Sequence, residues 1–97
     1  MTDPLTARAD VATATPERYA RQLASHLGRR SEVREEADGT RIVLAVGDCL
    51  LQSHEGRLEL LATAPGPEEL GRVADVVGRH LERFGQRNEL QVVWRRD

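Results

Sequence analysis

Apolar residues in the first third of the chain recur at helical spacing. Residues 16–27 carry an apolar side chain at every fourth position, which predicts a helix with one buried stripe formed by Tyr19, Leu23 and Leu27. Pro16 suits the first helical turn, where its missing N–H group would have no partner, and Gly28 ends the helix. A short strand over residues 9–13 is expected before this helix.

A second helical pattern follows the breaker Pro65-Gly66-Pro67 and runs to about Phe84, where Gly85 ends it. Its buried stripe is expected to contain Leu70, Val73, Val77, Leu81 and Phe84. Apolar and polar residues then alternate over residues 90–94, which predicts a final strand.

The middle of the chain has the composition of strands, interrupted by three two-residue turn signals: Asp38-Gly39, Gly47-Asp48 and Glu55-Gly56. Four antiparallel strands follow from this pattern. The two residues that flank such a turn face the same side of the sheet, so the turns assign every side chain to a face.

One predicted face is almost wholly apolar, and we expect it to form the core with the residues Val33, Ala37, Ile42, Leu44, Val46, Cys49, Leu51, Leu58, Leu60 and Ala62. The outer face mixes polar and apolar side chains, as antiparallel sheets do toward water or a partner: Arg34, Arg41, Val43, Ala45, Leu50, Gln52, His54, Arg57, Glu59 and Leu61.

These elements predict an α+β fold, a two-layer sandwich in which both helices cover the apolar face of a mostly antiparallel sheet, in the order β-α-β-β-β-β-α-β. The length of 97 residues is typical of one domain. Residues 1–8 are polar and lack periodicity, so we expect a disordered leader followed by a single α+β domain over residues 9–97.

Charge and cysteine content narrow the classes of partner. All 14 basic residues are arginine, and 16 acidic residues give a net charge of −2, so no long-range field attracts nucleic acid or an anionic membrane. We therefore expect neither as a partner. A single cysteine excludes an intrachain disulfide, and no apolar run approaches the roughly 18 residues of a membrane span. A cytoplasmic location is the expectation.

The sequence contains no phosphate-binding glycine loop, nucleophile elbow, zinc-protease helix, paired-cysteine zinc motif or EF-hand loop. These absences favour a non-enzymatic accessory or binding module over an enzyme, and the pattern names no cofactor. Catalysis of hydrolysis or isomerisation with His80 as general base has only the titration of histidine near neutral pH in its favour.

Three residues could form a metal or haem site. His26 and His80 lie toward the edges of the two apolar helix stripes, and Cys49 points to the sheet face that the helices cover. Imidazole and thiolate are good ligands for zinc, copper or haem iron. The alternative is structural: both histidines form hydrogen bonds at the margin of the core, and Cys49 is a small buried apolar residue.

The outer sheet face offers a second candidate surface. Val43, Leu50 and Leu61 interrupt its polar residues, and such a patch can form a homodimer interface or a docking site for a partner protein. An ordinary solvent-exposed face is the alternative. His54 lies beside the Glu55-Gly56 turn, where we expect an exposed and inert side chain, whereas Trp94 is expected to pack in the core.

Several short motifs together resemble a bacterial family known as domain of unknown function 2218: Ala14-Thr15-Pro16, Arg18-Tyr19, Leu23, His26, Gly47-Asp48-Cys49, the segment His80-Leu81-Glu82-Arg83-Phe84, and Leu90 through Trp94. The resemblance covers nearly the whole chain. It implies a small domain without an established activity, and an association with ferric-siderophore reductases that points toward iron handling. Carried over residue by residue, it falls on His26, Cys49, His80, Arg83 and Trp94. Many relatives follow the first histidine with an aromatic residue and another histidine, where this chain has Leu27 and Gly28.

Overall fold

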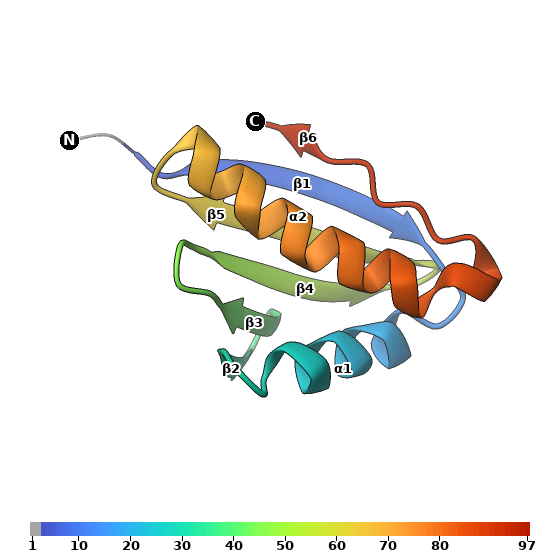
Figure 1. Cartoon of the computed structure of the whole chain (residues 1–97). Helices are drawn as coiled ribbons and strands as arrows, with labels where there is room; N and C mark the ends of the chain where they lie inside the picture. Colours follow the sequence, from blue (N-terminus) through green and yellow to red (C-terminus); the bar gives the residue numbers. More distant parts are fainter. Residues whose placement is uncertain (1–2) are drawn as a thin grey trace.

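Six antiparallel strands form one sheet, and both helices pack on one of its faces in a computed structural model that describes residues 3–97. The strand order is β2-β3-β4-β5-β1-β6, and α2 crosses in front of β1 and β5 (Figure 1). The elements are β1 (Leu5–Ala12), α1 (Pro16–Leu27), β2 (Glu32–Glu36), β3 (Gly39–Val43), β4 (Asp48–His54), β5 (Arg57–Ala64), α2 (Pro67–Phe84), the 3-10 helix η1 (Gln86–Asn88) and β6 (Arg95–Arg96). The predicted α+β class and element order are confirmed.

Both helices begin and end where the sequence predicted. Proline occupies the first turn of each helix, and a glycine follows the last residue of each. The Gly28 N–H donates to the carbonyl of Ala24 (2.8 Å), and the Gly85 N–H donates to the carbonyl of Leu81 (2.9 Å). Each of these bonds satisfies a carbonyl that the end of a helix otherwise leaves without a partner.

The core lies between the helix layer and the inner face of the sheet. Of the ten residues predicted for this face, six are buried, namely Ile42, Cys49, Leu51, Leu58, Leu60 and Ala62. Val33, Leu44 and Val46 are partly buried and pack against these. Full burial of a leucine side chain stabilises a fold by about 1.5–3 kcal/mol, so the aliphatic stripes of both layers hold them together.

The tenth residue, Ala37, is exposed because the first turn lies one residue earlier than predicted, at Ala37-Asp38. Thr40 consequently pairs with Glu35 instead of Ala37. Gly39 begins β3 at φ 153°, and a Cβ there would lie 2.2 Å from the carbonyl oxygen of Leu51, so only glycine fits.

The second reversal also differs from the prediction. Residues 44–47 form the loop, closed by the Leu44 N–H donating to the carbonyl of Gly47 (2.8 Å), whereas we expected a turn at Gly47-Asp48. Cys49 therefore pairs with Ile42 and not with Val46. The third turn, Glu55-Gly56, is confirmed, and its glycine adopts φ 76°.

The first and last strands required correction. Strand β1 begins at Leu5 and pairs with β5 along its whole length, so residues 5–8 belong to the sheet and not to a leader. The remaining part of the expected leader includes residues 1 and 2, which lie outside the described residues.

Residues 90–94 do not form a strand, although Leu90, Val92 and Trp94 pack against the core as their alternation predicted. The Val92 N–H donates to the Glu82 side chain (3.1 Å), and this bond takes the place of a ladder partner. The strand at this end is limited to Arg95–Arg96, at the edge of the sheet beside β1.

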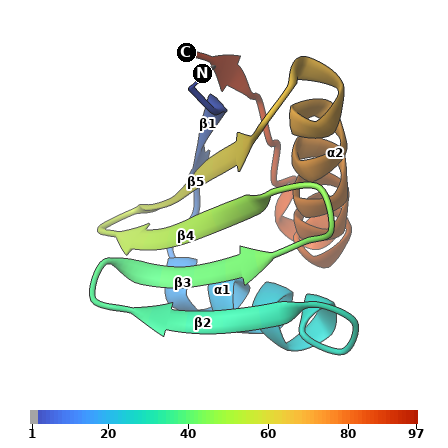
Figure 2. The same ribbon diagram turned by 90° about the vertical axis from the view of Figure 1, so that its left-hand side faces the viewer.

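Figure 2 shows α1 behind β2 and β3, and no helix of residues 3–97 lies on the other side of the sheet. We call this side the open sheet face. Within residues 3–97 no helix has the length and apolar character needed to cross a membrane.

Candidate functional site

The two helices meet at a cleft of about 440 Å³, which we call the histidine–arginine cleft. It lies where α1 ends, beside the middle of α2. Apolar side chains contribute part of its lining, and basic and hydroxyl groups contribute the rest: His26, Leu27, Arg29, Arg30, Ser31, Leu44, Val76 and His80. The cleft therefore combines an apolar wall with cationic groups.

His26 and His80 stand side by side in this cleft, one from each helix. Their ring centroids are 4.9 Å apart, and Phe84 packs edge-on against His26 at 5.4 Å. The Nδ1 atom of His80 lies 2.6 Å from the carbonyl oxygen of Val76, to which it donates a hydrogen bond. Nε2 of the neutral His80 ring consequently keeps a lone pair for a ligand.

Among the described residues, no carboxylate lines the histidine–arginine cleft. Within residues 3–97, Arg29 and Arg30 form no ion pair, and the same holds for Arg83 on α2. A smaller hollow of about 230 Å³ adjoins the cleft at His80 and is lined by Arg79, His80 and Arg83. Guanidinium groups stay protonated in proteins, so the arginines of the cleft and of the smaller hollow carry a local positive charge at any physiological pH.

Cys49 is not part of this group. Its side chain is fully buried on the inner face of the sheet, and burial raises the pKa of its thiol far above the ordinary value. A neutral buried thiol behaves as a small apolar side chain. In the part of the chain that the structure describes, no group of three His, Cys, Asp or Glu residues is placed to hold a metal ion. Of the three predicted ligands, the structure brings two together.

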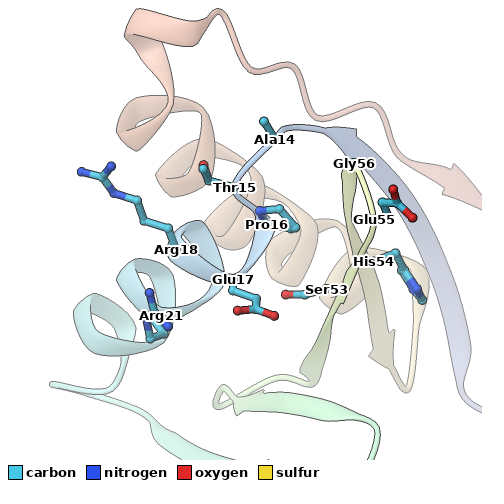
Figure 3. Close-up of a pocket in the computed structure, with 10 residues that line it drawn as sticks. All are labelled: Ala14, Thr15, Pro16, Glu17, Arg18, Arg21, Ser53, His54, Glu55 and Gly56. Carbon is cyan, nitrogen blue, oxygen red and sulfur yellow. The ribbon is translucent and has the colours of Figure 1, made fainter.

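A second hollow, of about 540 Å³, lies at the start of α1 and is lined by Ala14, Thr15, Pro16, Glu17, Arg18, Arg21, Ser53, His54, Glu55 and Gly56 (Figure 3). In Figure 3 the Glu17 and Ser53 side chains point toward one another, whereas His54 points away from them. Two carboxylates and two arginines line this hollow, so its charge selects neither an anion nor a cation.

On the open sheet face, ion pairs surround one nearly buried carboxylate. Glu59, which is 8% exposed, accepts hydrogen bonds from Arg8 (2.8 Å) and Arg57 (3.3 Å). The Nε2 atom of His54 lies 2.9 Å from Oε1 of Glu59. A second carboxylate, that of Asp10, accepts a hydrogen bond from Arg57 (2.6 Å). His54 therefore has a carboxylate partner and is only partly exposed, whereas an exposed side chain was expected at this turn.

The three residues proposed as an interface also lie on the open sheet face. Leu50 and Leu61 are directly opposite each other on β4 and β5, and Val43 pairs with Asp48 at the end of β3. Leu50 is only 7% exposed. Since no helix covers this face, neighbouring side chains of the sheet itself must bury Leu50, and the apolar area presented to a partner is smaller than the pattern indicated.

Comparison with known proteins identifies the family. A family model described as "Uncharacterized protein conserved in bacteria (DUF2218)" matches residues 8–95. The chain belongs to this family. The resemblance inferred from the sequence motifs is thus confirmed, and the chain is a bacterial domain of a family without a described activity.

Solved structures support the fold of this DUF2218 domain. The NMR structure of PA4090 from Pseudomonas aeruginosa is similar, with a TM-score of 0.77 and 24% sequence identity over 94% of this chain and 95% of that chain. At this identity the similarity shows the fold alone. No curated protein matches the chain.

For Arg29 and Arg30 the sequence alone favours a solvated end of a helix over contacts with an anion. Arg29 and Arg30 follow the end of α1, where basic residues are ordinary because they complement the helix dipole. They line the cleft because the fold places α2 beside the end of α1. For the smaller hollow, the signal in the sequence was the spacing of Arg79 and Arg83, because like charges four residues apart destabilise an isolated helix slightly.

Proposed function

We propose that this chain is a non-enzymatic binding module that holds a small organic anion in the histidine–arginine cleft. The lining of the cleft carries the proposal: within residues 3–97, two arginines without ion pairs and a hydroxyl group offer hydrogen-bond donors, and no carboxylate stands beside them. Guanidinium groups recognise carboxylate and phosphate groups through paired hydrogen bonds.

The apolar part of the lining favours an organic ligand over a bare inorganic ion. Leu27, Leu44 and Val76 can cover a carbon skeleton, while the basic groups hold its acidic group. The cleft volume of about 440 Å³ falls in the range of small-molecule sites, roughly 300–1,000 Å³. A ligand with an acidic head and a short apolar body satisfies both parts of the lining.

A ferric chelate with carboxylate or catecholate donors is one anion of this class. Such a ligand would connect the cleft with the iron and siderophore association that the family resemblance implies. In this form of the proposal the basic side chains hold the chelator's negative charge, and the iron keeps the donor atoms of the chelator. A cytoplasmic location, the expectation from the sequence, remains part of this proposal.

Binding of hexanoate, followed by amide chemical shifts of the full chain at low ionic strength, tests the proposal. We expect saturable shifts around the cleft that the double variant Arg29→Gln and Arg30→Gln abolishes. The matched control is Arg18→Gln, because Arg18 also has no ion pair in residues 3–97 but lies in α1 and lines the other hollow. Arginines that only complement the helix dipole need no ligand, so an absence of saturable shifts would refute the proposal.

One observation favours a metal or haem site as a second candidate. His80 Nδ1 is held by the Val76 carbonyl, an arrangement that orients metal-binding histidines in many proteins, and His26 stands next to it. Cys49 would have to leave the core to complete the predicted set of three. Elemental analysis of untagged protein after reconstitution tests this candidate, and less than about a tenth of an equivalent of any transition metal would end it.

A further inference from the structure

We infer that the ligand of the histidine–arginine cleft is a dicarboxylate or tricarboxylate with a short carbon skeleton. This inference rests on the proposed function and specifies its ligand class. It follows from the second arginine-lined hollow beside the cleft, which a ligand with a single acidic group would leave without a carboxylate.

His80 lines both hollows, so the two adjoin at this side chain. On one side of His80 the basic groups are Arg29 and Arg30, which follow α1. On the other side they are Arg79 and Arg83 of α2. A ligand whose acidic group contacts the first pair and whose skeleton crosses His80 brings any second acidic group to the other pair.

Of the two arginines of the second hollow, Arg79 has a carboxylate partner, and Arg83 lies in the last turn of α2, where a basic residue complements the helix dipole. Arg79 and Arg83 are four residues apart on the same flank of α2, and like charges at this spacing oppose helix formation. Asp75 lies 3.9 Å from Arg79 and offsets part of this repulsion, but Arg83 has no carboxylate partner in residues 3–97. An external carboxylate would supply the missing negative charge.

The apolar wall of the cleft selects carboxylates over compact inorganic anions. Leu27, Leu44 and Val76 form the apolar part of the lining, and their contact with the methylene groups of the ligand would stabilise a bound carbon chain. Inorganic phosphate offers no apolar surface to these three residues. We therefore expect phosphate to bind more weakly than an organic diacid of similar charge.

Hexanoate and adipate form a matched pair of probes, since both have six carbons and differ by one terminal carboxylate. We expect the wild-type chain to bind adipate about threefold to fivefold more tightly than hexanoate at low ionic strength, which is the effect of one additional exposed ion pair. In Arg83→Gln the preference for adipate should decrease, because only Arg79 then remains in the second hollow, whereas Arg18→Gln should preserve the wild-type ratio.

Each outcome of this titration decides one of the two proposals. Equal affinities in the wild-type chain, or an adipate preference that Arg83→Gln leaves unchanged, would overturn the dicarboxylate inference while hexanoate binding still supported the proposed function. Failure of both acids to bind would overturn the proposed function itself. Phosphate binding tighter than that of adipate would also overturn the inference, because the apolar wall would then contribute nothing.

Discussion

The carboxylate of Glu59 makes the open sheet face a test of how paired charges stabilise this fold. Its side chain is 10% exposed and contacts three basic groups, from Arg8 (2.8 Å), His54 (2.9 Å) and Arg57 (3.3 Å). Glu59→Gln keeps the shape of the side chain and removes its charge. The variant leaves three basic groups around a neutral amide, so unfolding should become easier.

The expected magnitude is set by the exposure of the partners. A hydrogen bond to a charged group contributes about 1.5–3 kcal/mol when buried, but exposed ion pairs contribute only about 0.2–1 kcal/mol. The Arg8 and Arg57 side chains are 43% and 42% exposed, so water screens both interactions. We expect Glu59→Gln to lower the free energy of unfolding by about 1–2 kcal/mol, which corresponds to a decrease in Tm of about 4–16 °C for a domain of this size.

Urea denaturation and thermal melting monitored by circular dichroism measure this change. The matched control is Glu55→Gln, because Glu55 is an exposed residue of the adjacent turn without an ion pair in residues 3–97. The control should change stability by less than about 0.5 kcal/mol. Equal stabilities of the two variants would refute the idea that this network stabilises the sheet.

Three further predictions concern acid stability, the core cysteine and self-association. The pKa of Glu36 is lowered, chiefly by a hydrogen bond from Arg41, so this pair stabilises the fold above pH 4.5 and ceases to do so as the pH falls through the folded-state pKa. Glu36→Gln should therefore make the free energy of unfolding less dependent on pH in the acid range, and an unchanged pH dependence would contradict the assignment. Cys49→Ser should lower the free energy of unfolding by about 1–3 kcal/mol in urea titrations, because the variant buries a hydroxyl group, and it should leave hexanoate binding unchanged. Loss of hexanoate binding in a folded variant would make Cys49 a ligand-binding residue. Homodimerisation through the open sheet face remains a prediction: light scattering should give twice the chain mass of 10.8 kDa, reduced to one chain by Val43→Glu, and a monomeric wild-type chain would exclude it.

The faces of the sheet could be predicted from the sequence although two of the three turns were misplaced. Thr40 pairs two residues away from its expected partner, and Cys49 pairs four residues away. Both shifts are even, and side chains alternate with a period of two, so an even shift returns every side chain to the same face. A pairing register shifted by one residue would have moved the aliphatic residues from the core to the open face.

Elements whose backbone partners come from side chains could not be predicted in the same way. The alternation of Leu90, Val92 and Trp94 correctly indicated which side chains pack inward. Their backbone does not join a ladder, because Val92 donates to the Glu82 carboxylate. The periodicity of apolar residues predicts which side chains are buried, but it does not predict the hydrogen-bond partner of each backbone N–H group.

The candidate site could not be predicted from composition either, because the net charge sums over the open sheet face and the helix layer, whose arginines differ in their ion pairs. On the open sheet face every arginine described by the structure has a carboxylate partner: Arg8, Arg34, Arg41, Arg57 and Arg95. Arg29, Arg30 and Arg83 on the helix layer have none in residues 3–97. Screening limits electrostatic attraction to about 10 Å at ordinary ionic strength, so an anion near the helices responds to these arginines and not to the total of −2. The unequal distribution of ion pairs between the two layers is therefore the physical reason to seek the ligand on the helix side.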